Sequence, residues 1–322
     1  MKIARILAVR NDRFGEFLLT LPALYALKEH YPGAELTLVV NGSVAELAAR
    51  IPCVDEVIVW ENKKHGFLEI GRFAARTAGK KYDLCVIFNP SKELNIVSFL
   101  AGIPARCGYN RKWGFLLNRT TEDKKHLGSM HETEYNLELL KTIGISTGSQ
   151  PLNFLLDIRD DDFSDKRLVH RGLSSKNFII IHPWASNTQK EWPLDKFKAV
   201  ALQIMNTLHI PCVLIGGPEE VKRADQFCND MPLINLTGKT SLIELAGLLK
   251  KGRVLLTNDS GPMHLAAAVG IPIVAIFRKQ PPAISARRWG PVGTSNSIIE
   301  NDVLAEISVE EVFHGVKTIL SR

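Results

Sequence analysis

The feature of this 322-residue chain that most restricts its fold is an alternation of short apolar runs with segments that can form helices. The first series of runs is Ile3–Val9, Glu35–Val40, Val54–Trp60, Leu84–Phe88 and Ala105–Tyr109. The second series is Phe178–His182, Cys212–Ile215, Leu233–Leu236, Val254–Thr257 and Ile273–Phe277. This alternation is typical of parallel sheets covered by helices on both faces. We therefore expect an α/β fold with two doubly wound, Rossmann-like domains.

A polar stretch separates the two series and indicates the domain boundaries. We expect an N-terminal domain over 1–156, a connector over 157–176, a C-terminal domain over 177–305 and a closing helix within 306–322. A chain of this length is long for a single hydrophobic core. Ligands of doubly wound sheets bind beyond the carboxyl ends of the strands. Functional residues should therefore follow strands, around a cleft between the two domains.

Charge and composition limit the partners of the chain. A net charge of +6 and a sequence pI of about 9.0 favour anionic partners. Aromatic residues are only 7% of the chain, which disfavours a nucleic-acid partner held by base stacking. The N-terminal MKIARILAVR is too short for a secretory signal, and the apolar stretch near Ile96–Ile103 is shorter than the roughly 20 residues of a membrane span. We expect a cytoplasmic protein.

Neither cysteines nor acidic residues form a convincing metal site. The five cysteines contain no CxxC pair, and several lie in apolar runs, as expected of buried free thiols in a reducing compartment: Cys53, Cys85, Cys107, Cys212 and Cys228. Asp160-Asp161-Asp162 imitates an Asp-x-Asp metal motif, but it lies in the connector and follows no apolar strand. We therefore expect no metal.

The loop after the first apolar run contains a carboxylate where a catalytic base can lie. Arg10 to Glu16 fits neither the G-x-G-x-x-G dinucleotide fingerprint nor the P-loop, which disfavours a nicotinamide-dependent oxidoreductase. Gly15 permits close approach of another group to the backbone. Glu16 either complements the dipole of the following helix or acts as a general base. The residues alone leave both interpretations open.

Two loops of the second series suit a nucleotide. Ser186, Thr188 and Lys190 supply two hydroxyls and one positive charge ahead of a helix that starts near Pro193, a combination that binds phosphate oxygens or forms an ordinary solvated loop. Glu220 follows another strand in the stretch IGGPEE. An acidic residue there either binds a ribose diol or belongs to an acidic first helical turn.

The stretch VLLTNDSGPMHLAAAV, residues 254–269, combines an anion-binding elbow with titratable side chains. Asp259 or Ser260 is expected to cap a helix that begins at Gly261 and Pro262. The N–H groups of its first turn form an anion site, and His264 is expected to face it as a donor. A capped helix with a satisfied histidine is the alternative, but it does not explain why a carboxylate and an imidazole crowd the same elbow.

Together these motifs resemble the ADP-heptose:lipopolysaccharide heptosyltransferases, which are inverting glycosyltransferases of the two-domain GT-B architecture. The resemblance lies in FGEFLLTLPALYALKEHYP, HPWAS with KEWP, IGGPEE, GKTSL and NDSGPMHLAAAVGIPIVAIF, which occur in family order over nearly the whole chain. It implies transfer of a heptose from ADP-heptose, with inversion and without a metal or other cofactor.

The resemblance also implies a role for each matching residue. Asp259, Ser260, Gly261 and His264 would hold the donor's pyrophosphate and sugar, with Asp259 facing the heptose. Lys190, with Ser186 and Thr188 nearby, would neutralise the leaving ADP; Glu220 would bind the ribose, and Thr240 would lie near the adenine. Glu16 would be the base, with Asp12 as the alternative, because the family usually has aspartate at the position of Glu16. Arg278-Lys279-Gln280 replaces the family's usual Gly-Pro-Thr after Phe277.

The implied acceptor is an anionic glycolipid, Kdo-lipid A or the inner core of lipopolysaccharide, met in transient contact with the cytoplasmic face of the inner membrane. Lys63, Lys64 and Arg111 are the residues expected to bind it, within a basic bias of the N-terminal half. Two alternatives remain. One is a GT-B enzyme for another nucleotide-sugar donor, and the other is a catalytically silent nucleotide-sugar-binding protein.

Overall fold

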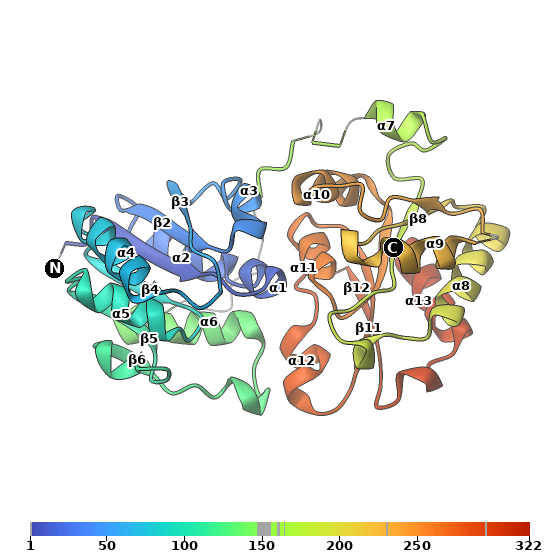
Figure 1. Ribbon diagram of the computed structural model, residues 1–322. Coiled ribbons are helices and arrows are strands. Elements are labelled where there is room, and N and C mark those ends of the chain that lie inside the picture. Colours follow the sequence, from blue (N-terminus) through green and yellow to red (C-terminus); the bar gives the residue numbers. More distant parts are fainter. Residues whose placement is uncertain (1, 147–155, 160–161, 164, 230, 294) are drawn as a thin grey trace. The chain divides into compact units, whose positions relative to one another are not determined.

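The computed structural model describes residues 2–146, 156–159, 162–163, 165–229, 231–293 and 295–322. The chain divides into two compact units, Met1–Leu152 and Asn153–Arg322, coloured blue to green and yellow-green to red in Figure 1. Asp160 and Asp161 of the acidic triplet lie outside the described residues.

Unit 1 is built on a parallel sheet with the strand order β3-β2-β1-β4-β5-β6. Its strands are β1 Arg5–Arg10, β2 Glu35–Val40, β3 Glu56–Val59, β4 Leu84–Ile87, β5 Ala105–Tyr109 and β6 Arg119–Thr121. Its helices are α1 Phe14–Leu18, α2 Leu21–His30, α3 Ala45–Ala48, α4 Phe67–Gly79, α5 Lys92–Leu100 and α6 Glu132–Leu140. Pro22 lies in the first turn of α2, which explains why the helical segment starts anew there.

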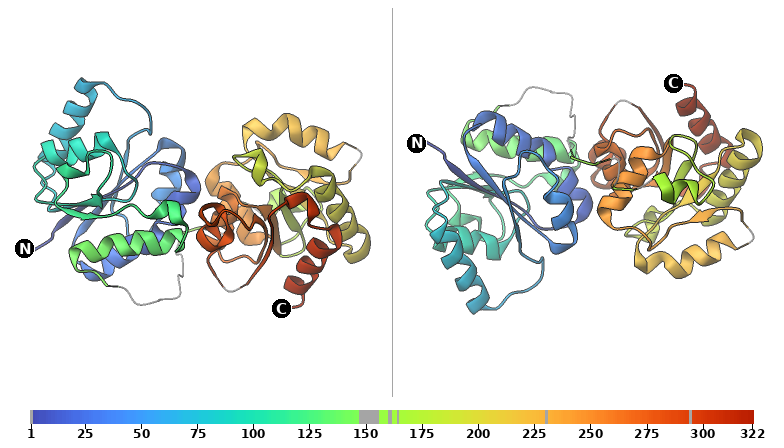
Figure 2. Two further views of the ribbon diagram at one scale, coloured as in Figure 1. Left: turned by 90° about the horizontal axis from the view of Figure 1, so that it is seen from below. Right: turned by 90° about the horizontal axis from the view of Figure 1, so that it is seen from above.

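Helices cover both faces of the unit 1 sheet (Figures 1 and 2). Helix α4 packs beside α5, and α2 packs beside α6. Leu7 and Val9 of β1 form one core with Phe73 of α4 and Val97 of α5. Because side chains alternate along a strand, the buried Ile6 and Ala8 point to the opposite face. The central strand is therefore apolar on both faces, as expected for a buried parallel sheet.

Unit 2 repeats this plan with the strand order β12-β11-β10-β7-β8-β9, again all parallel. Its strands are β7 Ile179–His182, β8 Cys212–Leu214, β9 Ile234–Asn235, β10 Val254–Asn258, β11 Ile273–Arg278 and β12 Asn296–Asn301. Its helices are α7 Asp165–Val169, α8 Leu194–Gln203, α9 Val221–Cys228, α10 Leu242–Lys251, α11 Gly261–Ala268, α12 Ala286–Trp289 and α13 Val309–Leu320.

The core of unit 2 includes residues from both of its ends. Val312 and Val316 of α13 join the same apolar cluster as Phe197 of α8 and Ile179 of β7. The stretch expected to be a connector also packs here, because Phe163 is fully buried and its backbone N lies 2.8 Å from the position that a Cβ on Gly247 of α10 would take. Both the predicted connector and the predicted closing helix therefore belong structurally to unit 2.

The ten predicted strands are all present, with ends that differ by up to two residues. Two further strands, β6 and β12, were not predicted. β6 has the sequence RTT and is largely exposed, and β12 has the sequence NSIIEN with polar ends. Both lie at the outer edge of their sheet, where only one strand neighbour is present and little apolar surface has to be buried.

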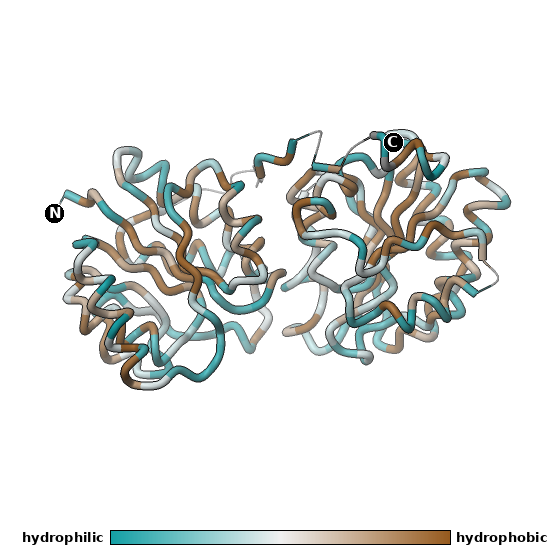
Figure 3. The backbone as a smooth tube through the Cα atoms, turned by 45° about the horizontal axis from the view of Figure 1, so that its top comes forward, coloured by the Kyte–Doolittle hydropathy of each residue, from teal (hydrophilic) through white to brown (hydrophobic). Residues whose placement is uncertain are grey.

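Figure 3 shows that hydrophobic residues are concentrated in the strands at the centre of each unit. Within the described residues, no helix is long and apolar enough to cross a membrane. The five cysteines are free; four are buried as predicted, and Cys228 is half-buried. Burial raises the pKa of the Cys53 and Cys212 thiols to about 12, so these groups stay protonated and inert.

Candidate functional site

The predicted donor-binding residues gather at the carboxyl edge of the unit 2 sheet. The strand order reverses between β7 and β10, and such a reversal is where doubly wound sheets bind ligands. Each of the loops that follow β7, β8, β9 and β10 contributes to the set: Ser186, Thr188, Lys190, Glu220, Thr240, Asp259, Ser260, Gly261 and His264. Parallel topology thus brings together residues up to 78 positions apart, from Ser186 to His264.

An ion pair lies at this reversal point. The Lys190 Nζ donates to Asp259 Oδ2 at 2.5 Å, although the two residues are 69 positions apart. Burial raises the pKa of Asp259, and the ammonium of Lys190 opposes that shift. The pair holds a cation and an anion side by side at the start of α11, where a phosphate and a sugar hydroxyl can each find a partner.

Asn258 holds the loop between β7 and α8 in place, and the sequence analysis did not single it out. Its side-chain amide donates to Pro183 O at 2.7 Å and accepts from the Trp192 backbone N at 3.0 Å. These two bonds fasten both ends of the loop that carries Lys190. An amide at the end of an otherwise apolar buried strand was the available signal, because a buried polar group requires partners.

The start of α11 differs from the prediction in one respect. Ser260 occupies the N-cap position, but its side chain makes no capping bond and contacts the Thr257 hydroxyl instead, at 3.0 Å. Asp259 does not cap either, because its carboxylate pairs with Lys190. The expected capping role is therefore wrong for both residues. The first-turn N–H groups consequently have no side-chain acceptor from these two residues, which suits an anion.

Two buried histidines lie at this edge of the sheet. His264 is buried in the first turn of α11. His182 ends β7, and its Nδ1 lies 3.4 Å from the Thr257 hydroxyl. Burial lowers the pKa of His182 to about 3, so this ring is neutral at physiological pH. Charge at this edge therefore comes from Lys190 and Asp259 rather than from His182.

The loop after β8 forms a compact turn around Glu220. The carboxylate of Glu220 accepts from the Gly217 backbone N at 2.6 Å, and burial, followed by repulsion from Glu219, raises its pKa. Gly216 lies against an indole, since a Cβ there would lie 2.6 Å from Trp184 Nε1. A side chain at position 216 therefore requires the indole to move.

Arg223 is a second residue that the sequence analysis did not single out. It binds both carboxylate oxygens of Glu191, at 3.1 and 2.6 Å, and its guanidinium lies over the Trp184 ring at 4.8 Å from the centroid. Glu191 also accepts from the Ala185 backbone N at 3.1 Å. Arg223 thereby ties α9 to the loop that carries Lys190.

Unit 1 has its own buried charge network at the end of β1. Arg10 is 2% exposed, and its guanidinium contacts Asp12 at 2.7 Å and Glu132 at 3.3 Å. Glu132 is 1% exposed and also binds Lys125 Nζ at 2.6 Å. Burial opposes the charge of Arg10, but the carboxylates of Asp12 and Glu132 keep its pKa above the ordinary value. Asp12 is therefore engaged by a fixed cation.

Glu16 lies in the short helix α1, next to this network. Burial raises its pKa, the charge of Asp12 raises it further, and Arg10 opposes both. Its carboxylate forms an ion pair with Arg13, at 3.9 Å. The ionic contact of Glu16 is looser than the 2.7 Å contact of Asp12 with Arg10. The raised pKa of Glu16 is a shift that suits a general base.

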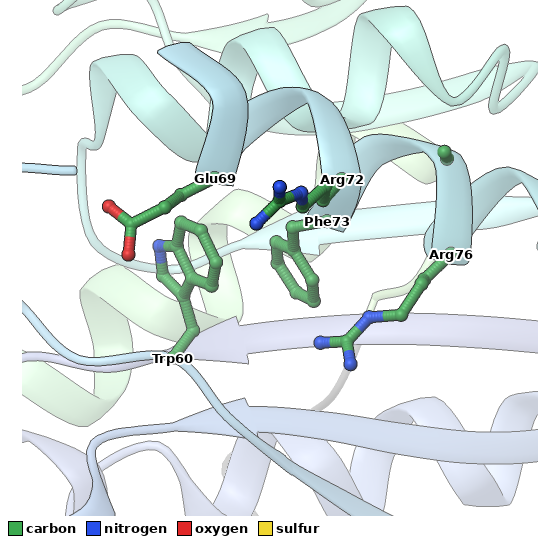
Figure 4. A pocket seen from close by; sticks show the side chains of 6 residues that line it. Trp60, Glu69, Arg72, Phe73 and Arg76 are labelled. Atoms are coloured by element: carbon green, nitrogen blue, oxygen red, sulfur yellow. The ribbon is translucent and has the colours of Figure 1, made fainter. Parts of the chain in front are cut away.

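The predicted acceptor-binding residues, like Glu16, lie at the carboxyl edge of the unit 1 sheet. Lys63 and Lys64 are exposed in the loop after β3. Arg111 follows β5 and pairs with Asp123 at 2.8 Å. A surface pocket of 460 Å³ lies nearby on α4 (Figure 4), lined by Trp60, Glu69, Arg72, Phe73, Ala75 and Arg76. None of the three predicted acceptor residues lines it.

No group of three or more His, Cys, Asp or Glu side chains suited to a metal ion occurs among the described residues. The groups at the start of α11 are the ammonium of Lys190, the carboxylate of Asp259, hydroxyls, the His264 imidazole and backbone N–H groups. This is a donor set for phosphate oxygens rather than for a cation.

Comparison with known proteins identifies the family. A model of glycosyltransferase family 9 (heptosyltransferase) matches residues 70–313 of the chain. The chain belongs to this family. The expected resemblance to heptosyltransferases is thus confirmed, and the chain is a glycosyltransferase.

Individual heptosyltransferases are similar to this chain over most of their length. Lipopolysaccharide heptosyltransferase 2 of Salmonella typhimurium is 27% identical over 293 residues, which cover 86% of this chain and 84% of that protein. Lipopolysaccharide heptosyltransferase 3 of Escherichia coli is 25% identical over 274 residues, covering 82% and 80%. The solved structure of E. coli ADP-heptose lps heptosyltransferase II has a TM-score of 0.82 at 23% identity and covers 98% of both chains. The predicted fold class, GT-B type α/β, is confirmed.

Proposed function

We propose that this family 9 enzyme transfers a heptose from ADP-heptose to the inner core of lipopolysaccharide, with inversion at the anomeric carbon and without a metal ion. The observation that carries the proposal is the Lys190–Asp259 pair at the start of α11. It combines a cation for a diphosphate, a carboxylate for a sugar hydroxyl and open helix N–H groups in one place.

Unit 2 is the proposed donor-binding unit. Lys190 moves from Asp259 to the diphosphate, with Ser186 and Thr188 of the same loop as hydroxyl donors. The N–H groups near Gly261, with Ser260 and His264, bind the remaining phosphate oxygens, and Asp259 accepts from heptose hydroxyls. These contacts aim positive charge at the leaving group, and each such donor is typically worth about 3–4 kcal/mol in the transition state.

The loops after β8 and β9 of unit 2 bind the nucleoside of the donor. Glu220 accepts from the ribose hydroxyls through the carboxylate oxygen that Gly217 does not engage, and Thr240 lies at the adenine. Thr240 is half-buried in the loop after β9. Gly238, two residues earlier in the same loop, has a φ of +69°. The backbone conformation at Gly238 is one that favours glycine, so the course of this loop depends on that residue.

Glu16 of unit 1 is the proposed general base. The acceptor hydroxyl gives its proton to Glu16 as its oxygen bonds to the anomeric carbon, and the bond from that carbon to the phosphate oxygen breaks with its electron pair going to ADP. Attack opposite to the leaving group inverts the anomeric centre.

The acceptor is the anionic part of a glycolipid, Kdo-lipid A or inner-core lipopolysaccharide. The exposed ammonium groups of Lys63 and Lys64, with Arg111, match its carboxylates and phosphates. Because this acceptor is anchored in a bilayer, the enzyme works in transient contact with the cytoplasmic face of the inner membrane.

The test uses purified protein, ADP-heptose and a deacylated Kdo-terminated acceptor, with release of ADP as the measurement. We expect turnover that persists in excess EDTA and a product of inverted anomeric configuration by NMR. Glu16→Gln should lower kcat by about 10²–10⁴-fold while leaving the Kd of ADP nearly unchanged. Glu29→Gln, at an exposed carboxylate of α2, is the matched control and should retain full turnover.

Three outcomes would contradict parts of the proposal. ADP binding without transfer to any acceptor would favour the silent binding protein. Transfer from another nucleotide sugar, but not from ADP-heptose, would change the donor. An unchanged kcat in Glu16→Gln would move the base to another residue, with Asp12 as the first to test.

A further inference from the structure

Exposed apolar and basic side chains occur on three segments at the carboxyl edge of the unit 1 sheet: the loop after β3 with the start of α4, the start of α5, and the loop after β5. Its apolar members are Phe67, Leu68, Trp113 and Phe115, which are 94%, 77%, 45% and 74% exposed. Its exposed cations are Lys63, Lys64, Lys92 and Lys112. We refer to these eight residues as the apolar–basic rim.

Direct contacts join the three segments that carry the rim. The His65 backbone N, in the loop after β3, donates to Glu93 in the first turn of α5 at 3.1 Å. Lys92, the neighbour of Glu93, places its Nζ 4.0 Å from the centre of the Trp113 ring. Asn95 of the same helix donates to Lys112 O at 2.9 Å. The loops after β3 and β5 are thus both fastened to the start of α5.

Stacked aromatic rings hold the loop after β3 against the unit 1 core, next to the exposed Phe67 and Leu68. His65 stacks on Trp60 with ring centroids 3.9 Å apart, and Trp60 stacks on Phe73 at 4.3 Å. His65 also contacts Glu61 O through Nε2 at 2.9 Å. These aromatic rings are buried while Phe67 and Leu68, immediately downstream, remain in solvent. Arg72 and Arg76 add positive charge along α4, the helix that begins at Phe67 (Figure 4).

The loop after β5 exposes its aromatics in a strained conformation. Lys112 and Trp113 both have positive φ, +49° and +68°, which L-residues with side chains seldom adopt. Two such residues in succession have to be held by their surroundings, and they leave Trp113 and Phe115 in solvent with their rings 5.8 Å apart. Exposed aromatics held at a conformational cost indicate a surface that is covered in use.

From this geometry we infer that the apolar–basic rim docks on a bilayer that contains anionic phospholipid. The apolar side chains enter the interfacial region and the lysines contact lipid phosphates. Four lysines against the exposed carboxylate of Glu69 and the partly exposed one of Glu93 give the rim a net positive charge. Alternating large apolar and basic side chains on a rigid support match a membrane interface. The inference rests on the proposed function only in that the acceptor lipid lies in the same bilayer.

The experiment measures co-sedimentation of the full-length protein with vesicles of phosphatidylcholine containing 30 mol% phosphatidylglycerol, and with pure phosphatidylcholine vesicles. We expect binding to the anionic vesicles that weakens at high salt. Phe67→Ser with Leu68→Ser should weaken it by roughly tenfold or more, because their apolar surface no longer leaves water. Lys63→Ser with Lys64→Ser should weaken it by about fivefold per lysine.

Matched controls lie elsewhere on the chain. Phe99 and Leu100, at the other end of α5, are 49% and 59% exposed, and their replacement by Ser should leave vesicle binding within twofold of wild type. Lys222 and Lys317 are exposed lysines of unit 2, and their replacement by Ser should also leave it unchanged. Equal losses in rim and control variants would overturn the inference.

Fluorescence locates the contact. Lipids brominated on the acyl chain should quench tryptophan emission of the bound protein, and Trp113→Phe should abolish that quenching. Quenching that persists in Trp113→Phe would place the contact elsewhere and overturn the inference. So would a dimer in sedimentation velocity that Phe67→Ser with Leu68→Ser dissociates, since the rim would then cover a second copy of the chain.

Activity separates this inference from the proposed function. Phe67→Ser with Leu68→Ser should retain wild-type turnover on the deacylated acceptor and lose it on vesicle-bound acceptor. Absence of turnover in the wild-type protein contradicts the proposed function without affecting the vesicle result. Vesicle binding that the rim variants leave intact contradicts the rim and leaves the proposed function standing.

Discussion

Replacement of Glu132 by Gln tests the buried charge network of unit 1 most directly. Glu132 serves two buried cations, Arg10 at 3.3 Å and Lys125 at 2.6 Å. Glu132→Gln keeps the shape of the side chain and removes its charge. Burial lowers the pKa of Lys125 and Arg10 lowers it further, while Glu132 and, to a smaller extent, Asp12 oppose both. The variant leaves two neighbouring buried cations with Asp12 as their remaining acid partner.

The expected cost is large because breaking a buried ion pair typically costs about 3–5 kcal/mol. We take the lower figure of about 3 kcal/mol, since Arg10 keeps its bond to Asp12 and those to Phe88 O and Asn136 Oδ1. For a domain of this size, 1 kcal/mol changes the Tm by roughly 2–4 °C, so the Tm of unit 1 should fall by roughly 6–12 °C.

Glu138→Gln, in the same helix α6, is the matched control. Glu138 pairs with Lys141 three residues along, and its side chain is 42% exposed. A surface pair contributes about 0–1 kcal/mol, so its Tm should stay within roughly 4 °C of wild type. Calorimetry gives the Tm of each variant, and hydrogen exchange of peptides from β1 and α6 assigns the change to unit 1. If both variants unfolded within 1 °C of each other, the network would not stabilise the fold and the reasoning would be refuted.

Three further predictions concern individual residues of the site. Glu16→Gln should stabilise the protein at pH 8, because folding raises the pKa of this glutamate and so disfavours its charged form. In urea unfolding, the gain in the free energy of unfolding should shrink to nothing as the pH falls below the pKa of Glu16 in the unfolded chain. A gain that persists at that pH would contradict the prediction. Lys190→Met should weaken ADP binding about 10–150-fold by calorimetry, the value of a hydrogen bond to a charged group, whereas an unchanged Kd would place the diphosphate elsewhere. Gly216→Ala should destabilise unit 2 by about 1–3 kcal/mol, because the new Cβ collides with Trp184. Gly33→Ala is the control, because nothing lies within 4 Å of a Cβ there and no collision results. Equal effects of the two variants in denaturant unfolding would show that the Trp184 indole moves aside freely.

Much of the architecture follows from local sequence patterns. Runs such as Glu35–Val40 and Val254–Thr257 lie in β2 and β10 because each is apolar enough to be buried on both faces of a parallel sheet. The run Asn296–Asn301 carries polar side chains at its ends and pairs only with β11, so its strand character depends on that neighbour rather than on its own composition. Edge strands of this kind have weak sequence signals.

The sequence by itself determined the two α/β units and the strand ends at which the proposed donor-binding residues lie, because strand and helix periodicity and turn residues act over a few neighbouring positions. Its motifs carried the resemblance to the family. The tertiary structure alone decided which charges meet. Arg10 finds Glu132 across 122 positions, Lys190 finds Asp259 across 69, and the Ser260 hydroxyl turns to Thr257 instead of capping α11. Such pairings depend on which strands are neighbours in a sheet, and on the high cost of leaving a buried charge or hydroxyl without a partner. Both conditions arise only once the whole sheet has formed.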